Sequence, residues 1–163
     1  MSETKHLTHP FPPLYDNTSK VLILGSFPSV VSRQKSFYYA NKMNRFWPVM
    51  GRIFAEVPED KEAFCHKHHI ALWDVIESCT ITGSSDSSIC DVKVNDIQGL
   101  IDKTKIRTVF TTGGKAASLY KKYVVCDAEH IALPSTSGAN ARMSLDALTE
   151  AYQLIKEKCD EEN

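Results

Sequence analysis

The chain has 163 residues, of which 42% are hydrophobic and 24% charged, and its formal net charge is −1. These values are ordinary for one soluble globular domain; they exclude a disordered or fibrous chain, and the length excludes two domains of usual size. The near-neutral charge argues against a surface that wraps a polyanion, but residues 33–45 hold four cations and no acid, which predicts a local basic edge.

The cysteines and the N-terminus indicate the compartment. Five cysteines stand singly without a Cys-x-x-Cys pair, so we expect reduced thiols in an intracellular protein, in the cytoplasm or, in a eukaryote, the nucleus. No apolar segment suits a signal peptide or a membrane span, so no membrane partner is expected. Residues 65–69 contain one Cys and three His; a polar helix end explains them better than a metal site, because the packed spacing suits no single coordination geometry.

In chain order, the first expected element is an extended, proline-stiffened lead-in over residues 1–19. Four short apolar runs then predict buried strands, and the stretches between them predict helices. A charged tail at residues 159–163 follows the last helix. The strands are expected over residues 21–24, 70–73, 108–111 and 130–133, and the helices over residues 46–55, 61–68, 95–103, 114–121 and 145–158.

This alternation predicts one α/β domain over residues 1–163, with right-handed crossovers and a parallel sheet. Open parallel sheets bind ligands outside the carboxyl ends of their strands. Segments rich in Gly, Ser and Pro follow those ends at residues 25–29, 112–115 and 134–140, and Asp74 follows the second strand. The sequence therefore predicts a ligand site at this edge of the sheet, in a protein that we expect to be a monomer.

Residues 37–47 form an unusual segment with five large aromatic residues, two amides and two cations. Aromatic faces can stack on an extruded base, and cations can meet phosphate. Core packing explains residues 37–39 equally well, so both interpretations stay open. Asn44 could be the N-cap of a helix that begins at Arg45.

Three other loops carry polar groups. The segment Gly25-Ser26-Phe27-Pro28-Ser29, taken alone, is typical of a plain turn between a strand and a helix. Residues 135–140 carry hydroxyls and backbone amides that can donate hydrogen bonds to a phosphodiester. Residues 111–116 place two glycines and a lysine at a helix N-terminus, which favours an anion, but the upstream Gly of a nucleoside-triphosphate loop is missing. Residues 84–88 are expected to form a polar surface loop.

Five motifs occur in order along the chain. They are Gly-Ser-Phe-Pro-Ser from residue 25, Tyr-Tyr-Ala-x-x-x-Asn-Arg-Phe-Trp from 38, Leu-Trp-Asp-Val-Ile from 72, Gly-Ser-x-Asp-Ser from 83, and Leu-Pro-Ser-Thr-Ser-x-Ala-Asn from 133. Together they resemble the hypoxanthine-DNA glycosylase branch of the uracil-DNA glycosylase superfamily, over residues 21–140. The resemblance implies a three-layer α/β/α sandwich with a central four-stranded parallel sheet. It also implies a monofunctional DNA glycosylase of base excision repair, which flips out a deaminated base and hydrolyses its N-glycosidic bond. Hypoxanthine is the base that the resemblance favours, and no metal or cofactor is expected.

The resemblance also implies roles for individual residues. Phe27 stands where uracil-specific members hold an Asp or Asn, so the catalytic residue becomes Asn44, whose amide carbonyl would orient water at the anomeric carbon. Phe46 matches the aromatic residue that stacks on the flipped base. The other residues expected to bind the base are Gly25, Ser26, Phe27, Trp73 and Asp74. A further set of residues, which includes Lys115 at the possible anion site, is expected to bind DNA. These residues are Pro28, Ser29, Lys42, Arg45, Lys115, Ser135, Thr136, Ser137, Gly138, Ala139 and Asn140.

Two places depart from the pattern of this branch. Gly138 replaces a Pro, which is expected to loosen the DNA-facing loop, and residues 41–43 are Asn-Lys-Met in place of His-Pro-Arg. Three other functions stay open: a mismatch-type uracil-DNA glycosylase, a catalytically weak DNA-binding member of the fold, and a hydrolase of free nucleosides or nucleotides.

Overall fold

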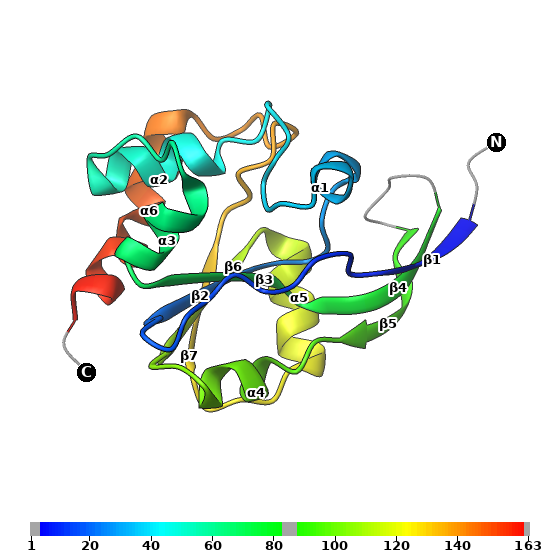
Figure 1. The fold of residues 1–163 in the computed structure, drawn as a ribbon. Coiled ribbons are helices and arrows are strands. Elements are labelled where there is room, and N and C mark those ends of the chain that lie inside the picture. The colour runs from blue at the N-terminus through cyan, green and yellow to red at the C-terminus, as the bar shows by residue number, and fades with distance from the viewer. Residues whose placement is uncertain (1–3, 83–87, 162–163) are drawn as a thin grey trace.

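A four-stranded parallel sheet forms the centre of the protein. The computed structural model describes residues 4–82 and 88–161, and the strand order of this sheet is β3-β2-β6-β7 (Figure 1). The strands are β2 (Val21–Gly25), β3 (Ile70–Asp74), β6 (Thr108–Thr112) and β7 (Glu129–Leu133), so the four predicted strands are confirmed.

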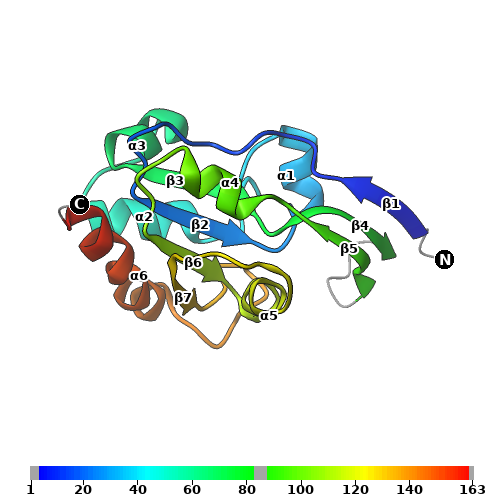
Figure 2. The same cartoon turned by 90° about the horizontal axis from the view of Figure 1, so that it is seen from below.

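Helices cover both faces of this sheet, because successive side chains of its strands point to opposite faces. In β2, Val21 and Ile23 pack into one core cluster, whereas Leu22 and Leu24 pack into the other. The first cluster is covered by α2 (Phe46–Phe54), α3 (Lys61–Lys67) and α6 (Leu145–Asp160). The second is covered by α4 (Ile97–Asp102) and α5 (Gly114–Tyr123), which lie across the sheet from α6 (Figure 2). The three-layer α/β/α sandwich is the expected fold, and every expected helix is present with its ends within two residues.

A second sheet was not predicted. It is antiparallel, has the strand order β1-β4-β5, and consists of β1 (Thr4–Thr8), β4 (Ile76–Thr82) and β5 (Cys90–Val94). β4 starts two residues after β3 ends, so one continuous stretch of chain passes from the parallel sheet into the antiparallel one (Figure 1). The expected lead-in therefore contains a paired strand, and a short helix, α1 (Val30–Lys35), follows the turn after β2. The polar loop expected at residues 84–88 lies outside the described residues except for Ser88.

The remaining part of the lead-in runs along the outer edge of β3. The backbone groups of Leu14 and Leu72 exchange two hydrogen bonds of 2.9 and 2.8 Å. Residues 9–13 lie between this bridge and β1, and the lead-in thereby reaches the carboxyl end of β3. This path brings residues from the N-terminus to the edge at which a ligand site is expected.

The cysteines and histidines fit structural roles. All five cysteines are free, and burial raises the pKa of the Cys65 and Cys159 thiols to about 12. The cluster at residues 65–69 lies at the C-terminal end of α3, where His66 faces Asp16 and His68 faces Glu56. Within residues 4–82 and 88–161, no three His, Cys, Asp or Glu side chains are grouped to hold a metal, and no helix is long and apolar enough to cross a bilayer.

Candidate functional site

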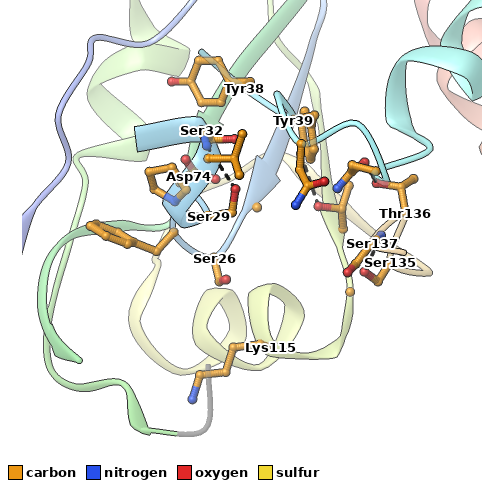
Figure 3. Close-up of a pocket in the computed structure, with 18 of the residues that line it drawn as sticks. Ser26, Ser29, Ser32, Tyr38, Tyr39, Asp74, Lys115, Ser135, Thr136 and Ser137 are labelled. Atoms are coloured by element: carbon orange, nitrogen blue, oxygen red, sulfur yellow. Dashed lines mark hydrogen bonds between the residues drawn. The ribbon is translucent and has the colours of Figure 1, made fainter. Parts of the chain in front are cut away.

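A cleft of about 850 Å³ opens at the predicted edge of the parallel sheet. Its walls come from the turn after β2, the segment before α2, the end of β3, the start of α5 and the loop after β7. In Figure 3, Ser135, Thr136 and Ser137 lie on one side of the cleft and Asp74 and Ser29 on the other. The predicted site residues that line it are residues 25–29, Asn44, Asp74, Lys115 and residues 135–139.

Phe46 does not lie in the cleft, contrary to the prediction that it stacks on a flipped base. Its side chain is fully buried and belongs to the core beneath α2. One face of its ring is covered by Tyr39, with 3.8 Å between the ring centroids and 13° between the ring planes. Tyr39 lines the cleft, so of these two rings the one that a ligand can meet is that of Tyr39, with Phe46 packed behind it.

Several contacts hold Tyr39 in this position. Its φ of 53° lies in the left-handed region, which a residue with a large side chain occupies only when its surroundings impose it. The stack on Phe46 and a 3.3 Å hydrogen bond between the Tyr39 and Thr112 hydroxyls supply that constraint. Burial, reinforced by the charge of Asp74, raises the pKa of Tyr39 above its ordinary value, so its hydroxyl stays protonated. Of the aromatic residues left open by the sequence, Phe37 packs against Trp47 instead.

Asn44 lines the cleft, but its carbonyl is not available for water. Oδ1 accepts a 2.9 Å hydrogen bond from the Phe46 backbone N–H and a 2.8 Å hydrogen bond from the Thr136 hydroxyl. These two bonds use both acceptor sites of the amide oxygen. Among the described residues, none bonds to Nδ2, and this amino group is not buried. Asn44 therefore presents a hydrogen-bond donor to the cleft, whereas the sequence predicted an acceptor.

The same hydrogen bond determines how α2 begins. The helix starts at Phe46, where the predicted range 46–55 begins, but its N-cap residue is Arg45 and not Asn44. Asn44 accepts a hydrogen bond from the first backbone N–H of the helix. Thr136 comes from the loop after β7 and is 2% exposed. The Asn44 amide is therefore fixed by two separate segments of the chain, which gives it one orientation.

Arg45, which is predicted to bind DNA, is not among the residues that line the cleft. Its guanidinium donates hydrogen bonds to the backbone carbonyls of Met143, Ser137 (3.0 Å) and Asn140 (2.8 Å). Asn140, also predicted to contact DNA, is outside the cleft and donates its side-chain amide to the Ser135 carbonyl at 2.9 Å. Both side chains therefore hold the loop at residues 135–143 in shape. Three of the five guanidinium N–H groups bond to carbonyls of this loop, and Nε is buried without a partner among the described residues, so Arg45 acts as a clamp for the loop.

The two departures from the branch pattern lie against each other. A Cβ added to Gly138 would lie 3.0 Å from both Cβ and the backbone oxygen of Met43. The loop after β7 therefore approaches the turn before α2 more closely than a larger residue would permit. The sequence predicts that Gly138 loosens this loop, and the structure shows a close backbone approach to Met43 at this position.

We expect Gly138→Ala to lower the free energy of unfolding by about 1 kcal/mol, because the added methyl group would lie 3.0 Å from the Met43 backbone oxygen. Thermal denaturation measures the effect. Gly114→Ala is the matched control, since a Cβ there has nothing within 4 Å and lies in the first turn of a helix, where alanine is favoured. Equal melting temperatures for the wild type and Gly138→Ala would contradict the close contact.

The other predicted residues divide between the cleft and its surroundings. Trp73 is half-buried between the two core clusters and does not line the cleft, so its predicted contact with a base is not supported. Lys42 is exposed beside the lining residues Asn41 and Met43. Lys115 lines the cleft from the first turn of α5, where the helix dipole also favours an anion.

A buried pair that sequence reasoning missed closes the inner end of the cleft. Nε2 of His9 lies 2.8 Å from Oδ2 of Asp74, and their side chains are 4% and 6% exposed. His9 comes from the lead-in and Asp74 from the end of β3, 65 residues later. A single histidine in a proline-rich lead-in gives no signal in the sequence, because its partner is brought to it only by the pairing of β1 with β4.

Comparisons with known proteins agree with this architecture. Residues 12–156 match the profile of the uracil DNA glycosylase superfamily. A protein of Methanosarcina acetivorans named hypoxanthine DNA glycosylase is 38% identical over 146 residues, which cover 86% of this chain and 92% of that protein. One of the same name from Methanosarcina barkeri is 32% identical, over 81% of this chain and 87% of the relative.

A solved structure gives the same result in three dimensions. The solution NMR structure of a uracil-DNA-glycosylase-like protein from Methanosarcina acetivorans superposes with a TM-score of 0.80 and 34% sequence identity. The match covers 93% of this chain and 97% of the other. The family profile spans most of the sequence, and the parallel sheet carries its cleft at the expected edge. The chain therefore belongs to the uracil DNA glycosylase superfamily.

Proposed function

We propose that this protein is a DNA glycosylase that takes a deaminated base into the cleft and hydrolyses its N-glycosidic bond, leaving an abasic site. The preferred base in this proposal is hypoxanthine. The observation that carries the proposal is the fixed Asn44 amide, whose free amino group enters a cleft walled by the Tyr39 ring. Two relatives named hypoxanthine DNA glycosylase support the choice of base.

Binding begins with extrusion of the nucleotide, because the glycosidic bond cannot be reached inside a duplex. Unstacking costs a few kcal/mol, and a damaged or mismatched base costs less than a paired one. The face of Tyr39 that Phe46 does not cover offsets part of this cost by stacking, worth about 1–3 kcal/mol. The rigid Tyr39–Phe46 stack is formed before the base arrives, so little ordering remains to be done on binding.

In the chemical step, cleavage gives the sugar oxocarbenium character and leaves negative charge on the departing base. Nδ2 of Asn44 donates a hydrogen bond toward that base, and a donor fixed before the reaction stabilises developing charge without reorganisation. An amide is not a base, so water adds to an already cationic sugar with little activation, and the proton that it loses passes to the anionic base, which leaves as the neutral molecule. This assignment reverses the direction of the Asn44 hydrogen bond relative to the role implied by the family resemblance.

The DNA backbone is held at the mouth of the cleft by Lys115, Ser135 and Ser137, which line it, whereas the buried Thr136 hydroxyl is used by Asn44. We further propose that the protein acts on DNA as a monomer, because one chain supplies every wall of the cleft. Its five free thiols suit a reducing compartment.

Lys115→Ala is expected to weaken binding to DNA by about tenfold at moderate salt and to reduce the slope of log K against log salt by about one, because one phosphate contact is lost. Fluorescence anisotropy over a salt series gives both values. Lys122→Ala removes an exposed cation from the last turn of the same helix and is the matched control, with an unchanged slope expected. Equal slopes for the two variants would remove Lys115 from the DNA contact.

The test of the function is a glycosylase assay on oligonucleotides that contain hypoxanthine, uracil or xanthine, with alkaline cleavage of abasic sites as the readout. We expect abasic product from hypoxanthine DNA. Product from uracil mismatches alone would identify the mismatch-type uracil enzyme, and binding without product would identify a DNA-binding member of the fold. Release of hypoxanthine from free inosine would identify a nucleoside hydrolase.

A further inference from the structure

Met43 places an exposed apolar side chain at the mouth of the cleft. The described residues include six large hydrophobic side chains that are exposed, and two of them, Val30 and Met43, line the cleft. Met43 is 71% exposed, and its unbranched side chain reaches farther from the backbone than that of a valine. A single exposed apolar residue is ordinary on a protein surface, so its significance depends on where it lies and how it is held.

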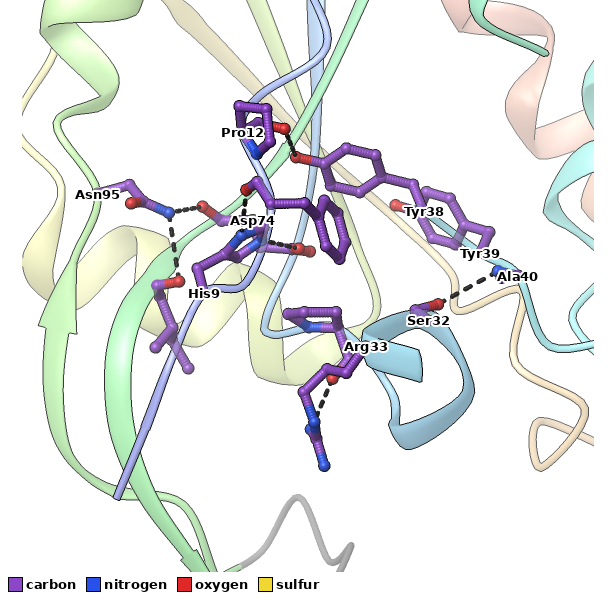
Figure 4. Close-up of polar contacts among 12 residues, drawn as sticks. His9, Pro12, Ser32, Arg33, Tyr38, Tyr39, Ala40, Asp74 and Asn95 are labelled. Carbon is purple, nitrogen blue, oxygen red and sulfur yellow. Dashed lines mark hydrogen bonds and ion pairs between the residues drawn. The ribbon is translucent and has the colours of Figure 1, made fainter. Parts of the chain in front are cut away.

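The backbone that carries Met43 is fixed. The backbone N–H of Met43 donates to Oδ1 of Asn41 at 2.9 Å, and that of Asn44 donates to the Asn41 carbonyl at 2.9 Å, which closes a tight turn. Before this turn, the backbone N–H of Ala40 donates to the hydroxyl of the buried Ser32 at 3.2 Å (Figure 4). Met43 therefore extends from a preformed turn, and only its side chain has to be ordered on binding.

The loop after β7 meets this turn with small residues. Residues 137–139 of that loop line the cleft and are Ser-Gly-Ala, and an added Cβ on Gly138 would lie 3.0 Å from the Met43 Cβ. The backbone N–H of Arg45 donates to the Thr136 carbonyl at 2.9 Å, which joins the turn to the loop. The lining residues of the loop supply no large side chain at this junction, so the group that projects from it is the Met43 thioether.

Extrusion of a nucleotide leaves a gap in the duplex. The two base pairs beside the gap lose a stacking partner, which is part of the cost of unstacking. Apolar side chains that enter a duplex between base steps contact these ring faces, and methionine is among the residues that DNA-binding proteins use in this way. The gap lies directly outside the mouth, because the base moves from that position into the cleft. A long apolar side chain held at the mouth is therefore placed to enter it.

We propose that the Met43 side chain enters the gap that the extruded nucleotide leaves in duplex DNA and packs against the neighbouring base pairs. This role rests on the proposed glycosylase function and concerns the DNA around the target, since Met43 does not contact the extruded base. The branch pattern has an arginine at this position, so the apolar contact is specific to this chain. The ligand is the pair of ring faces on either side of a vacated position in a DNA duplex.

Duplex and single-stranded DNA separate this role from other contacts, because only a duplex holds a gap between two base pairs. The probe is an oligonucleotide with a tetrahydrofuran abasic analogue, used alone or paired with its complement, so that neither a target base nor cleavage is involved. Met43→Ala is expected to weaken binding to the duplex by about 10- to 100-fold, as for loss of one buried methionine side chain, and binding to the single strand by less than about twofold. Fluorescence anisotropy measures both affinities.

Three further variants show which property of the side chain matters. Met43→Leu keeps an apolar side chain of similar size and is expected to retain the duplex affinity. Met43→Gln keeps the length but adds polar groups, and it is expected to lose affinity as alanine does. The slope of log K against log salt is expected to be unchanged in all of them, since no phosphate contact is lost. Val57→Ala shortens an exposed apolar residue outside the cleft and is the matched control, with both affinities unchanged.

An equal loss of affinity for duplex and single strand in Met43→Ala would overturn the inference, because Met43 would then only support the turn beside Asn44. A Met43→Ala or Met43→Gln protein that binds the duplex as tightly as the wild type would also overturn it, as would a wild type that does not bind the duplex. Thermal melts establish that each variant is folded. Failure of the proposed function is seen separately, as the absence of abasic product from every lesion with the wild-type protein.

Discussion

Asn44→Asp is expected to slow release of hypoxanthine by about 100- to 1,000-fold and to leave the fold intact. The substitution keeps the oxygen that accepts from Phe46 and Thr136, so both hydrogen bonds and the start of α2 are preserved. The group that changes is the one facing the cleft, where a donor becomes a carboxylate oxygen. A negative charge beside a departing base that itself gains negative charge raises the barrier, and loss of one such donor costs about 2.7–4 kcal/mol in other enzymes.

Single-turnover kinetics with excess enzyme measure this rate apart from DNA affinity. Asn41→Asp adds the same charge in the turn before α2 and is the matched control, with a loss below about tenfold expected. Asn44→Ala serves as a second comparison, since it removes both the donor and the helix contact and is expected to lower stability by about 1 kcal/mol as well. An Asn44→Asp protein as active as the wild type would mean that Asn44 activates water as an acceptor, which is the role that the family resemblance implied.

Arg45→Met is expected to lower the free energy of unfolding by about 3 kcal/mol and to weaken DNA binding without changing its salt dependence. Methionine keeps an apolar stem but leaves the carbonyls of Met143, Ser137 and Asn140 without their donor. Each lost hydrogen bond from a charged group costs about 1–3 kcal/mol, partly recovered by water at a half-buried site. For a domain of this size the melting temperature falls by about 6–12 °C.

Calorimetry and anisotropy over a salt series check the two parts of this prediction. Arg52→Met is the matched control on α2, because its ion pair with Asp146 is exposed and is worth under about 1 kcal/mol. If Arg45→Met melted like the wild type and reduced the salt slope by about one, Arg45 would contact phosphate, as the sequence predicted. The two variants therefore separate a loop clamp from a DNA contact.

The parallel sheet, its helices and the position of the cleft could be predicted from the sequence because their signals are local. A continuous apolar run such as residues 21–24 indicates a strand buried on both faces, and the Gly, Ser and Pro that follow mark the turn at its carboxyl end. The topology of the sheet then places such turns at one edge. None of these steps needs to know which residues meet across the chain.

The details of the site depend on contacts between distant segments, and for this reason they were not predicted. Whether Tyr39 or Phe46 faces a ligand is decided by the left-handed backbone at Tyr39 and by the stack between the rings. The orientation of Arg45 is decided by carbonyls more than 90 residues later. The antiparallel sheet escaped prediction because β1 and β4 lie about 70 residues apart and each has only a short, partly polar pattern.

The placement of β1 has a consequence for the buried pair of His9 and Asp74. β1 is an edge strand with mostly exposed residues, and it leads directly into the segment that carries His9. Opening of such a terminal strand requires less free energy than global unfolding, so it occurs more often, and each opening draws the imidazole away from Asp74. Warming or mild denaturant should therefore break this buried contact before the parallel sheet unfolds. Amide hydrogen exchange in β1 would report how often the contact is open.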